Sequence, residues 1–133
     1  MAPPIRVIVA DDDVLLREGV ASVLARSNFD VVAQAGDGEE LAQLTRELRP
    51  DIVLVDIRMP PTHTTEGLDA ARAIRAELPE IGILVLSAHV EVDHAMELLA
   101  SGERSGYLLK SRVTDVENFL ENVQRVADGG SVV

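Results

Sequence analysis

Short apolar runs alternate with amphipathic stretches five times along the chain. The apolar runs are rich in β-branched residues, which is typical of strands buried on both faces of a parallel sheet. The sequence predicts strands over residues 5–10, 30–35, 52–55, 81–86 and 107–109. The run over 30–35 is less apolar than the first, so we expect it near an edge of the sheet.

Between these runs, apolar residues recur every three or four positions, which is the spacing of one helix face. Two residue pairs, Asp37 with Glu40 and Thr114 with Glu117, are typical of capping boxes that open helices. Proline and glycine mark several of the helix ends. The sequence therefore predicts five helices, over about residues 14–26, 37–49, 68–78, 92–102 and 114–128.

Strict alternation of strands and helices implies a doubly wound α/β fold, in which five helices cover both faces of a five-stranded parallel sheet. A common strand order in this flavodoxin-like class is 2-1-3-4-5. The order then reverses between the first and third strands, and ligands bind at the carboxyl edge where the order reverses. We therefore expect the functional site at the ends of strands 5–10 and 52–55.

The composition excludes several classes of protein. The chain has 133 residues, 47% of them hydrophobic and 26% charged, which suits one globular domain with a full core. Its net charge of −11 and its scattered arginines argue against nucleic-acid binding. Without cysteine, disulfides and thiolate metal sites are excluded. The sequence shows no signal peptide or membrane-spanning run, so we expect a cytoplasmic protein that makes no membrane contact.

Two of the predicted strands end in aspartates. Asp11, Asp12 and Asp13 follow the first strand, and Asp56 follows the third. The carboxyl ends of parallel strands meet at one edge of a sheet, so these carboxylates would converge, and such a cluster usually holds a cation. Hard oxygen ligands suit Mg²⁺. We assign Asp11 and Asp12 to the metal, and Asp13 to capping of the helix that follows.

Asp56 is the strongest candidate for the residue that reacts with a substrate. At the end of the central strand its carboxylate would meet the metal, and a carboxylate oxygen can attack phosphorus to form an acyl phosphate. The metal would offset the charges of both partners. The alternatives are that Asp56 is only a third metal ligand or a helix cap. Its combination with Asp11 and Asp12 favours the functional interpretation.

Three further side chains lie at or near predicted strand ends. Lys110, the only lysine, could supply a positive charge to a bound anion. The hydroxyl of Ser87 could donate to a phosphoryl oxygen, although serine is common at such junctions. Tyr107, the only tyrosine, is by position alone a half-buried aromatic residue of an edge strand. Of the three histidines, His89 is the nearest to these residues, two positions after Ser87.

Four short motifs, over residues 10–12, 55–60, 86–88 and 106–110, lie in this order at the ends of the predicted strands. Together they resemble the receiver domain of bacterial two-component response regulators. The resemblance implies that a histidine kinase donates a phosphoryl group to Asp56. It also implies Mg²⁺ as cofactor, bound by Asp11, Asp12, Asp56 and the backbone carbonyl of Arg58.

The same resemblance gives roles to residues around the phosphoryl group. Ser87 and Lys110 would hold its oxygens, and Tyr107 would change rotamer as Ser87 moves. Arg58 and His89 stand at positions that tune the lifetime of the phosphoryl group in the family.

Three segments, over residues 17–20, 106–110 and 127–133, are similar to the subfamily whose receivers precede a LuxR/NarL-type helix-turn-helix domain. The resemblance implies a receiver over 1–128, and a linker starting at 129–133 that leads to an output domain beyond this chain. It also implies homodimer formation on phosphorylation. Two features depart from the family: a longer, threonine-rich loop over 60–67, and Ser111 in place of the usual proline, so no cis peptide is expected there.

The leading hypothesis is a phosphorylation-controlled signalling domain rather than an enzyme. The main alternative is an interaction module that keeps the fold without phosphorylation. Two enzyme-like classes fit less well: a flavodoxin needs a Ser/Thr/Gly-rich phosphate loop where residues 11–13 stand, and an aspartate-nucleophile phosphatase needs a threonine after its aspartates. The sequence has neither feature at that position.

Overall fold

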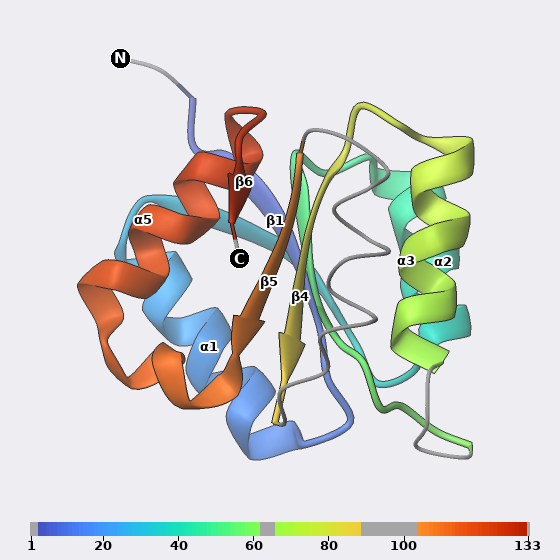
Figure 1. Ribbon diagram of the computed structural model, residues 1–133, viewed down its shortest axis with the longest axis horizontal. Coiled ribbons are helices and arrows are strands. Elements are labelled where there is room, and N and C mark those ends of the chain that lie inside the picture. The colour runs from blue at the N-terminus through green and yellow to red at the C-terminus, as the bar shows by residue number, and fades with distance from the viewer. Residues whose placement is uncertain (1–2, 62–65, 89–103, 133) are drawn as a thin grey trace.

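In the part of the chain that the structure describes, three layers are seen, with a parallel β-sheet between two pairs of α-helices (Figure 1). The molecule is known from a computed structural model that describes residues 3–61, 66–88 and 104–132. Helices α2 (Gly38–Leu48) and α3 (Glu66–Glu77) cover one face of the sheet, and α1 (Val14–Arg26) and α5 (Val116–Ala127) cover the other. This is the doubly wound α/β architecture that the alternation of strands and helices predicts.

The sheet has six strands in the order β2-β1-β3-β4-β5-β6, and each neighbouring pair is parallel. The order of the first five is the predicted one, with β2 at the edge as expected. A 3-10 helix, η1 (Lys110–Thr114), leads from β5 toward α5. The strands are β1 (Ile5–Ala10), β2 (Phe29–Ala35), β3 (Ile52–Asp56), β4 (Gly82–Ser87), β5 (Ser105–Leu109) and β6 (Ser131–Val132).

Two apolar clusters, one on each face of the sheet, hold the layers together. Successive residues of β3 alternate between them: Val53 belongs to the cluster under α2 and α3, whereas Ile52 and Leu54 belong to the cluster under α1 and α5. All of β3 is buried. Strands covered on both faces need apolar residues at every position, which explains the continuous apolar runs of the sequence.

Side-chain caps open α1 and α2 as predicted. A carboxylate oxygen of Asp13 accepts a hydrogen bond from the amide of Leu16 at 3.1 Å. A carboxylate oxygen of Asp37 accepts one from the amide of Glu40 at 2.7 Å. Each cap satisfies an amide that has no partner inside its helix.

The predicted capping residue of the last helix, Thr114, is wrong. The N-cap of α5 is Asp115, whose carboxylate accepts a hydrogen bond from the amide of Asn118 at 3.2 Å. The hydroxyl of Thr114 instead donates to the backbone carbonyl of Ser111 at 2.8 Å, within η1. The 3-10 turn thus uses the threonine and moves the start of α5 one residue along the chain.

The sheet has six strands where the sequence analysis predicts five. The additional strand, β6, pairs with β5 through Ser131 opposite Ser105 and Val132 opposite Gly106. The chain turns back after α5 at Gly129, whose φ of +103° is one that residues with a side chain rarely adopt. A strand of two residues is too short to show a period, so the pattern of the sequence could not reveal it.

Some predictions fall on residues that the structure does not describe. The helix expected over 92–102 lies outside the described ranges, as do His63, His89 and His94. The described ranges contain four α-helices, and none of these is long and apolar enough to cross a membrane. The peptide bond before Ser111 is trans, as expected.

Candidate functional site

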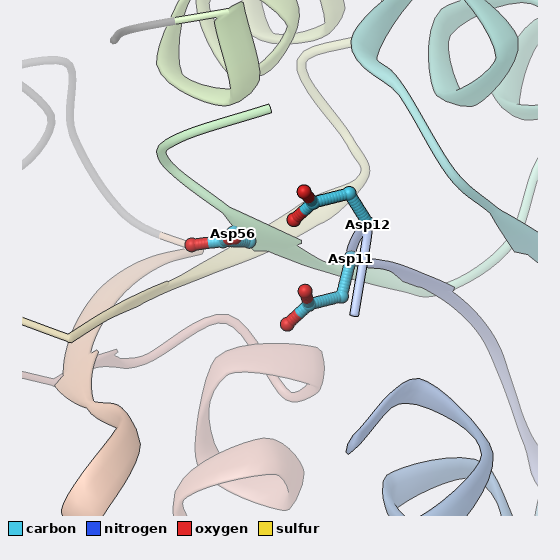
Figure 2. Close-up of side chains that lie close together, drawn as sticks. All are labelled: Asp11, Asp12 and Asp56. Carbon is cyan, nitrogen blue, oxygen red and sulfur yellow. The ribbon is translucent and has the colours of Figure 1, made fainter. Parts of the chain in front are cut away.

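Three carboxyl groups lie together at the carboxyl edge of the two central strands (Figure 2). Asp11 and Asp12 follow β1, and Asp56 is the last residue of β3. These strands are direct neighbours, with Ala10 opposite Val55, so the residues that follow lie side by side. One carboxylate oxygen from each aspartate lies within 4.8 Å of the other two. The structure thus brings together the three acids that the sequence singles out.

Lys110 closes one side of this acidic cluster. It directly follows β5, and its Nζ lies 3.0 Å from Oδ2 of Asp11 and 3.3 Å from Oδ2 of Asp56. The Lys110 side chain is 20% exposed, whereas those of Asp11 and Asp56 are 4% and 8% exposed. One ammonium group therefore pairs with two of the three carboxylates.

Hydrogen bonds fix Asp11 in the loop after β1. Its amide donates to the carbonyl of Ala35 at 3.0 Å, which ties the loop to β2. Its Oδ1 accepts from the amide of Asp13 at 2.9 Å, and its Oδ2 faces Lys110. Asp11 is thus held through its backbone and through both carboxylate oxygens.

Arg17 reaches the same loop from the first turn of α1. Its Nη1 donates to the backbone carbonyl of Asp11 at 3.0 Å and, more weakly, to that of Ala35 at 3.5 Å. Its Nε donates to the side-chain carbonyl of Gln34 at 3.1 Å. The sequence singles out Arg17 only as part of a subfamily motif, because its acceptors on β2 lie 17 and 18 positions along the chain.

The cluster shifts the pKa values of two of its members. Burial raises the pKa of Asp56 above its ordinary value of 3.8, and the charge of Asp11 raises it further. Lys110 and a hydrogen bond with the backbone of Arg58 oppose this rise without cancelling it. Burial acts to lower the pKa of Lys110, but the hydrogen bonds and charges of Asp11 and Asp56 outweigh it and raise that pKa above 10.5.

Ser87 and Tyr107 lie on the neighbouring strands β4 and β5. Ser87 ends β4 and is 3% exposed, and it stands opposite Leu109, the residue before Lys110. Tyr107 is 7% exposed and packs in the cluster under α2 and α3. The expectation of a half-buried tyrosine on an edge strand is therefore wrong, because Tyr107 packs in that cluster and β5 has β6 as a further neighbour.

Gly67 supports the site in a way that the sequence analysis does not identify. Its amide donates to the carbonyl of Ile57 at 2.8 Å, and a Cβ at this position would collide with the backbone carbonyl of Asp56. The start of α3 therefore lies directly against the backbone that carries Asp56. Glycine at the junction of a loop and a helix is the signal, but it equally indicates an ordinary turn.

Comparison with known proteins places this geometry in a family. The family model of the response regulator receiver domain matches residues 7–124. This chain belongs to that family. The receiver domain is 38% identical over 130 residues to the transcriptional regulatory protein DegU of Brevibacillus brevis, an alignment that covers 97% of this chain and 52% of DegU. The chain spans about half the length of the curated relatives that it matches.

Solved structures place the receiver domain among LuxR/NarL-type regulators. It is similar to a LuxR-family two-component response regulator from Aurantimonas sp., with a TM-score of 0.84 and 28% identity over 98% of this chain and 89% of that one. It is also similar to the signal receiver domain of NarL from Mycobacterium tuberculosis. That match has a TM-score of 0.74 and 33% identity, over 90% of this chain and 96% of the NarL chain.

Proposed function

We propose that this receiver domain accepts a phosphoryl group from a histidine kinase on Asp56 and changes conformation as a result. The observation that carries the proposal is the cluster of buried Asp11, half-buried Asp12 and buried Asp56, with Lys110 beside Asp11 and Asp56. Asp56 ends the central strand and is the residue that the family resemblance assigns as acceptor. Membership of the receiver family supports a signalling role rather than enzymatic turnover.

The donor set of the acidic cluster fits Mg²⁺. The ion prefers hard oxygen ligands, and Asp11, Asp12 and Asp56 offer three of them within 4.8 Å of one another. On the basis of the resemblance, we include the backbone carbonyl of Arg58 as a further ligand. Lys110 pairs with Asp11 and Asp56, and a divalent cation would supply further positive charge to the cluster. When bound, Mg²⁺ would offset the charge of the carboxylates and of the incoming phosphoryl group.

The transfer would be a substitution at phosphorus. A carboxylate oxygen of Asp56 bonds to phosphorus while the N–P bond of the phosphohistidine breaks, and the imidazole leaves with the electron pair. Ser87 and Lys110 would donate hydrogen bonds to the phosphoryl oxygens. The Nζ of Lys110 already lies 3.3 Å from Oδ2 of Asp56, so its positive charge is placed to stabilise the negative charge of the phosphoryl group.

The switch would pass from the phosphoryl group to β4 and β5. Movement of Ser87 toward the phosphoryl oxygens would allow Tyr107, on the directly paired strand, to change rotamer. Such a covalent change needs to favour one of two pre-existing conformations by a few kcal/mol. Arg58, which is exposed beside the cluster, and His89 would tune the lifetime of the phosphoryl group.

The partners follow from the relatives, several of which are transcriptional regulators. We propose a receiver over residues 1–128, followed from 129–133 by a linker to a helix-turn-helix output domain in the full-length protein. Phosphorylation would promote a homodimer and so control transcription. The receiver itself would contact neither DNA nor membrane, and it would act in the cytoplasm, where it would meet the kinase.

The test is chemical phosphorylation of the intact chain. Incubation with acetyl phosphate and Mg²⁺ should add one phosphoryl group, detected by mass spectrometry, and Asp56→Asn should abolish the addition. Asp30→Asn, an exposed change on β2, should leave it intact. If the wild-type chain stays unmodified, the alternative of a phosphorylation-independent interaction module is favoured instead.

A further inference from the structure

Arg17, which lies outside the acidic cluster, contacts the loop that carries Asp11 and Asp12. Its guanidinium joins three parts of the fold: α1, which carries it, the loop after β1, and the end of β2. The three acceptors are the side-chain carbonyl of Gln34 and the backbone carbonyls of Asp11 and Ala35, all uncharged. In these three contacts, Arg17 therefore donates to neutral carbonyl oxygens rather than to a carboxylate.

The contact with Asp11 has a specific geometric effect. The carbonyl of Asp11 belongs to the peptide group that joins Asp11 to Asp12, and Arg17 Nη1 lies 3.0 Å from it. On the other side of Asp11, its amide is tied to the carbonyl of Ala35. Both peptide groups that flank Asp11 are thus fixed, and rotation of the second would turn the side chain of Asp12 away from the cluster.

The end of β2 is shaped to admit the guanidinium. A Cβ at Gly36 would stand 3.3 Å from Nη1 of Arg17, so a larger residue there would crowd the contact. The Nε–Gln34 bond fixes the far side of the guanidinium plane. A lysine would carry the same charge on a single nitrogen and could not reproduce this planar, two-sided arrangement.

We propose that Arg17 is a positioning residue, which fixes the peptide group between Asp11 and Asp12 and thereby sets where the Asp12 carboxylate meets a divalent cation. The proposal rests on the proposed function in one respect, because Mg²⁺ binding at the acidic cluster belongs to it. It goes further by assigning a role to a residue that touches neither the ion nor the phosphoryl group.

The experiment compares four versions of the 133-residue chain: wild type, Arg17→Met, Arg17→Lys and Arg26→Met. Arg26 is an exposed residue of the same helix that donates only within α1, to Ser22, in the described contacts, so its variant is the matched control. Calorimetric titration with Mg²⁺ gives the affinity, amide hydrogen exchange at residues 11–13 without metal gives the rigidity of the loop, and thermal unfolding checks that each variant is folded.

Arg17→Met should weaken Mg²⁺ binding about tenfold, the lower end of the usual effect of residues that orient metal ligands. Amide exchange at residues 11–13 should become faster, Arg17→Lys should recover only a minor part of either loss, and Arg26→Met should match wild type. Equal affinity in Arg17→Met would overturn the proposal. So would full recovery in Arg17→Lys, because charge alone would then explain the effect.

Two further outcomes remain decisive. If Arg17→Met does not fold, Gln34→Met removes one anchor of the guanidinium and should still weaken Mg²⁺ binding and speed the exchange; no change in either would overturn the proposal. If wild type binds no Mg²⁺, the proposed metal site fails. Exchange at residues 11–13 then decides the role of Arg17 separately: unchanged exchange in Arg17→Met overturns it, and faster exchange supports it.

Discussion

At the scale of single residues, burial destabilises the charged form of the Asp56 carboxyl group. Its pKa is raised in the fold, so its contribution to stability is greatest below 3.8 and declines as the pH rises through the raised pKa. Asp56→Asn removes this ionisation. We expect it to stabilise the metal-free protein by about 1 kcal/mol at pH 7 and by much less near pH 4. Urea unfolding with EDTA at both pH values measures this, and a variant less stable than wild type at pH 7 would contradict it.

Lys110 stabilises the folded protein, because its ammonium group pairs with the carboxylates of Asp11 and Asp56. Its pKa is raised in the fold by its hydrogen bonds and charge interactions with Asp11 and Asp56, so near neutral pH it stays charged and its effect follows the ionisation of these partners. Lys110→Met should destabilise the metal-free protein by about 3 kcal/mol at pH 7, because it leaves Asp11 and Asp56 unpaired, and by less near pH 4.

The matched control for Lys110 is Arg46→Met. Arg46 pairs with Glu77 at 2.8 Å, but the two side chains are 52% and 50% exposed. Its loss should change the unfolding free energy by less than about 1 kcal/mol. Equal destabilisation by the two variants would show that the Lys110 contacts contribute no more than an exposed ion pair.

The sequence reveals some residues of the site and not others, depending on whether their position along the chain determines their place in the fold. Asp11, Asp56 and Lys110 could be found from the sequence because each follows an apolar strand, and parallel strands bring such positions to one edge. Arg17 and Gly67 could not, since their roles depend on contacts across elements: Arg17 with the end of β2, and Gly67 with the backbone of Asp56. Local spacing does not encode such contacts.

At the scale of elements, the start of α5 gives a direct test of the cap. Asp115→Ala should destabilise the protein by about 1 kcal/mol, because the amide of Asn118 loses its acceptor. Thr114→Ala should have less than half that effect, since its hydroxyl bonds to Ser111 outside α5. Thermal unfolding of both variants distinguishes them, and a larger loss from Thr114→Ala would restore the capping box that the sequence predicts.

The elements that the sequence predicts well are those with a clear apolar run or a clear capping residue. β1 and α1 have the predicted limits, because five of the six β1 residues are apolar and Asp13 marks the start of α1. The sequence does not distinguish Thr114 from Asp115 as the cap of α5, because the two are adjacent and the choice depends on η1. β6 exists only because β5 is beside it.

At the scale of the whole molecule, metal binding should couple to folding. A ligand that binds only the folded chain stabilises it by about 2.7 kcal/mol at a hundred times its dissociation constant. Mg²⁺ should therefore raise the melting temperature of wild type, and Asp12→Ala should abolish that rise. Asp30→Asn should keep it. A rise of the same size in Asp12→Ala would place the stabilising ion elsewhere on this acidic chain, whose net charge is −11.

The short strand β6 has a consequence for how this chain is handled. It gives β5 a hydrogen-bonded neighbour on each side, with β4 on the other. A chain trimmed after Asp128 would uncover this edge of β5 at Ser105 and Gly106, and bare strand edges are templates for intermolecular pairing and aggregation. Fluorescent labels or affinity tags therefore belong beyond Val132, where they leave the pairing of β6 with β5 in place.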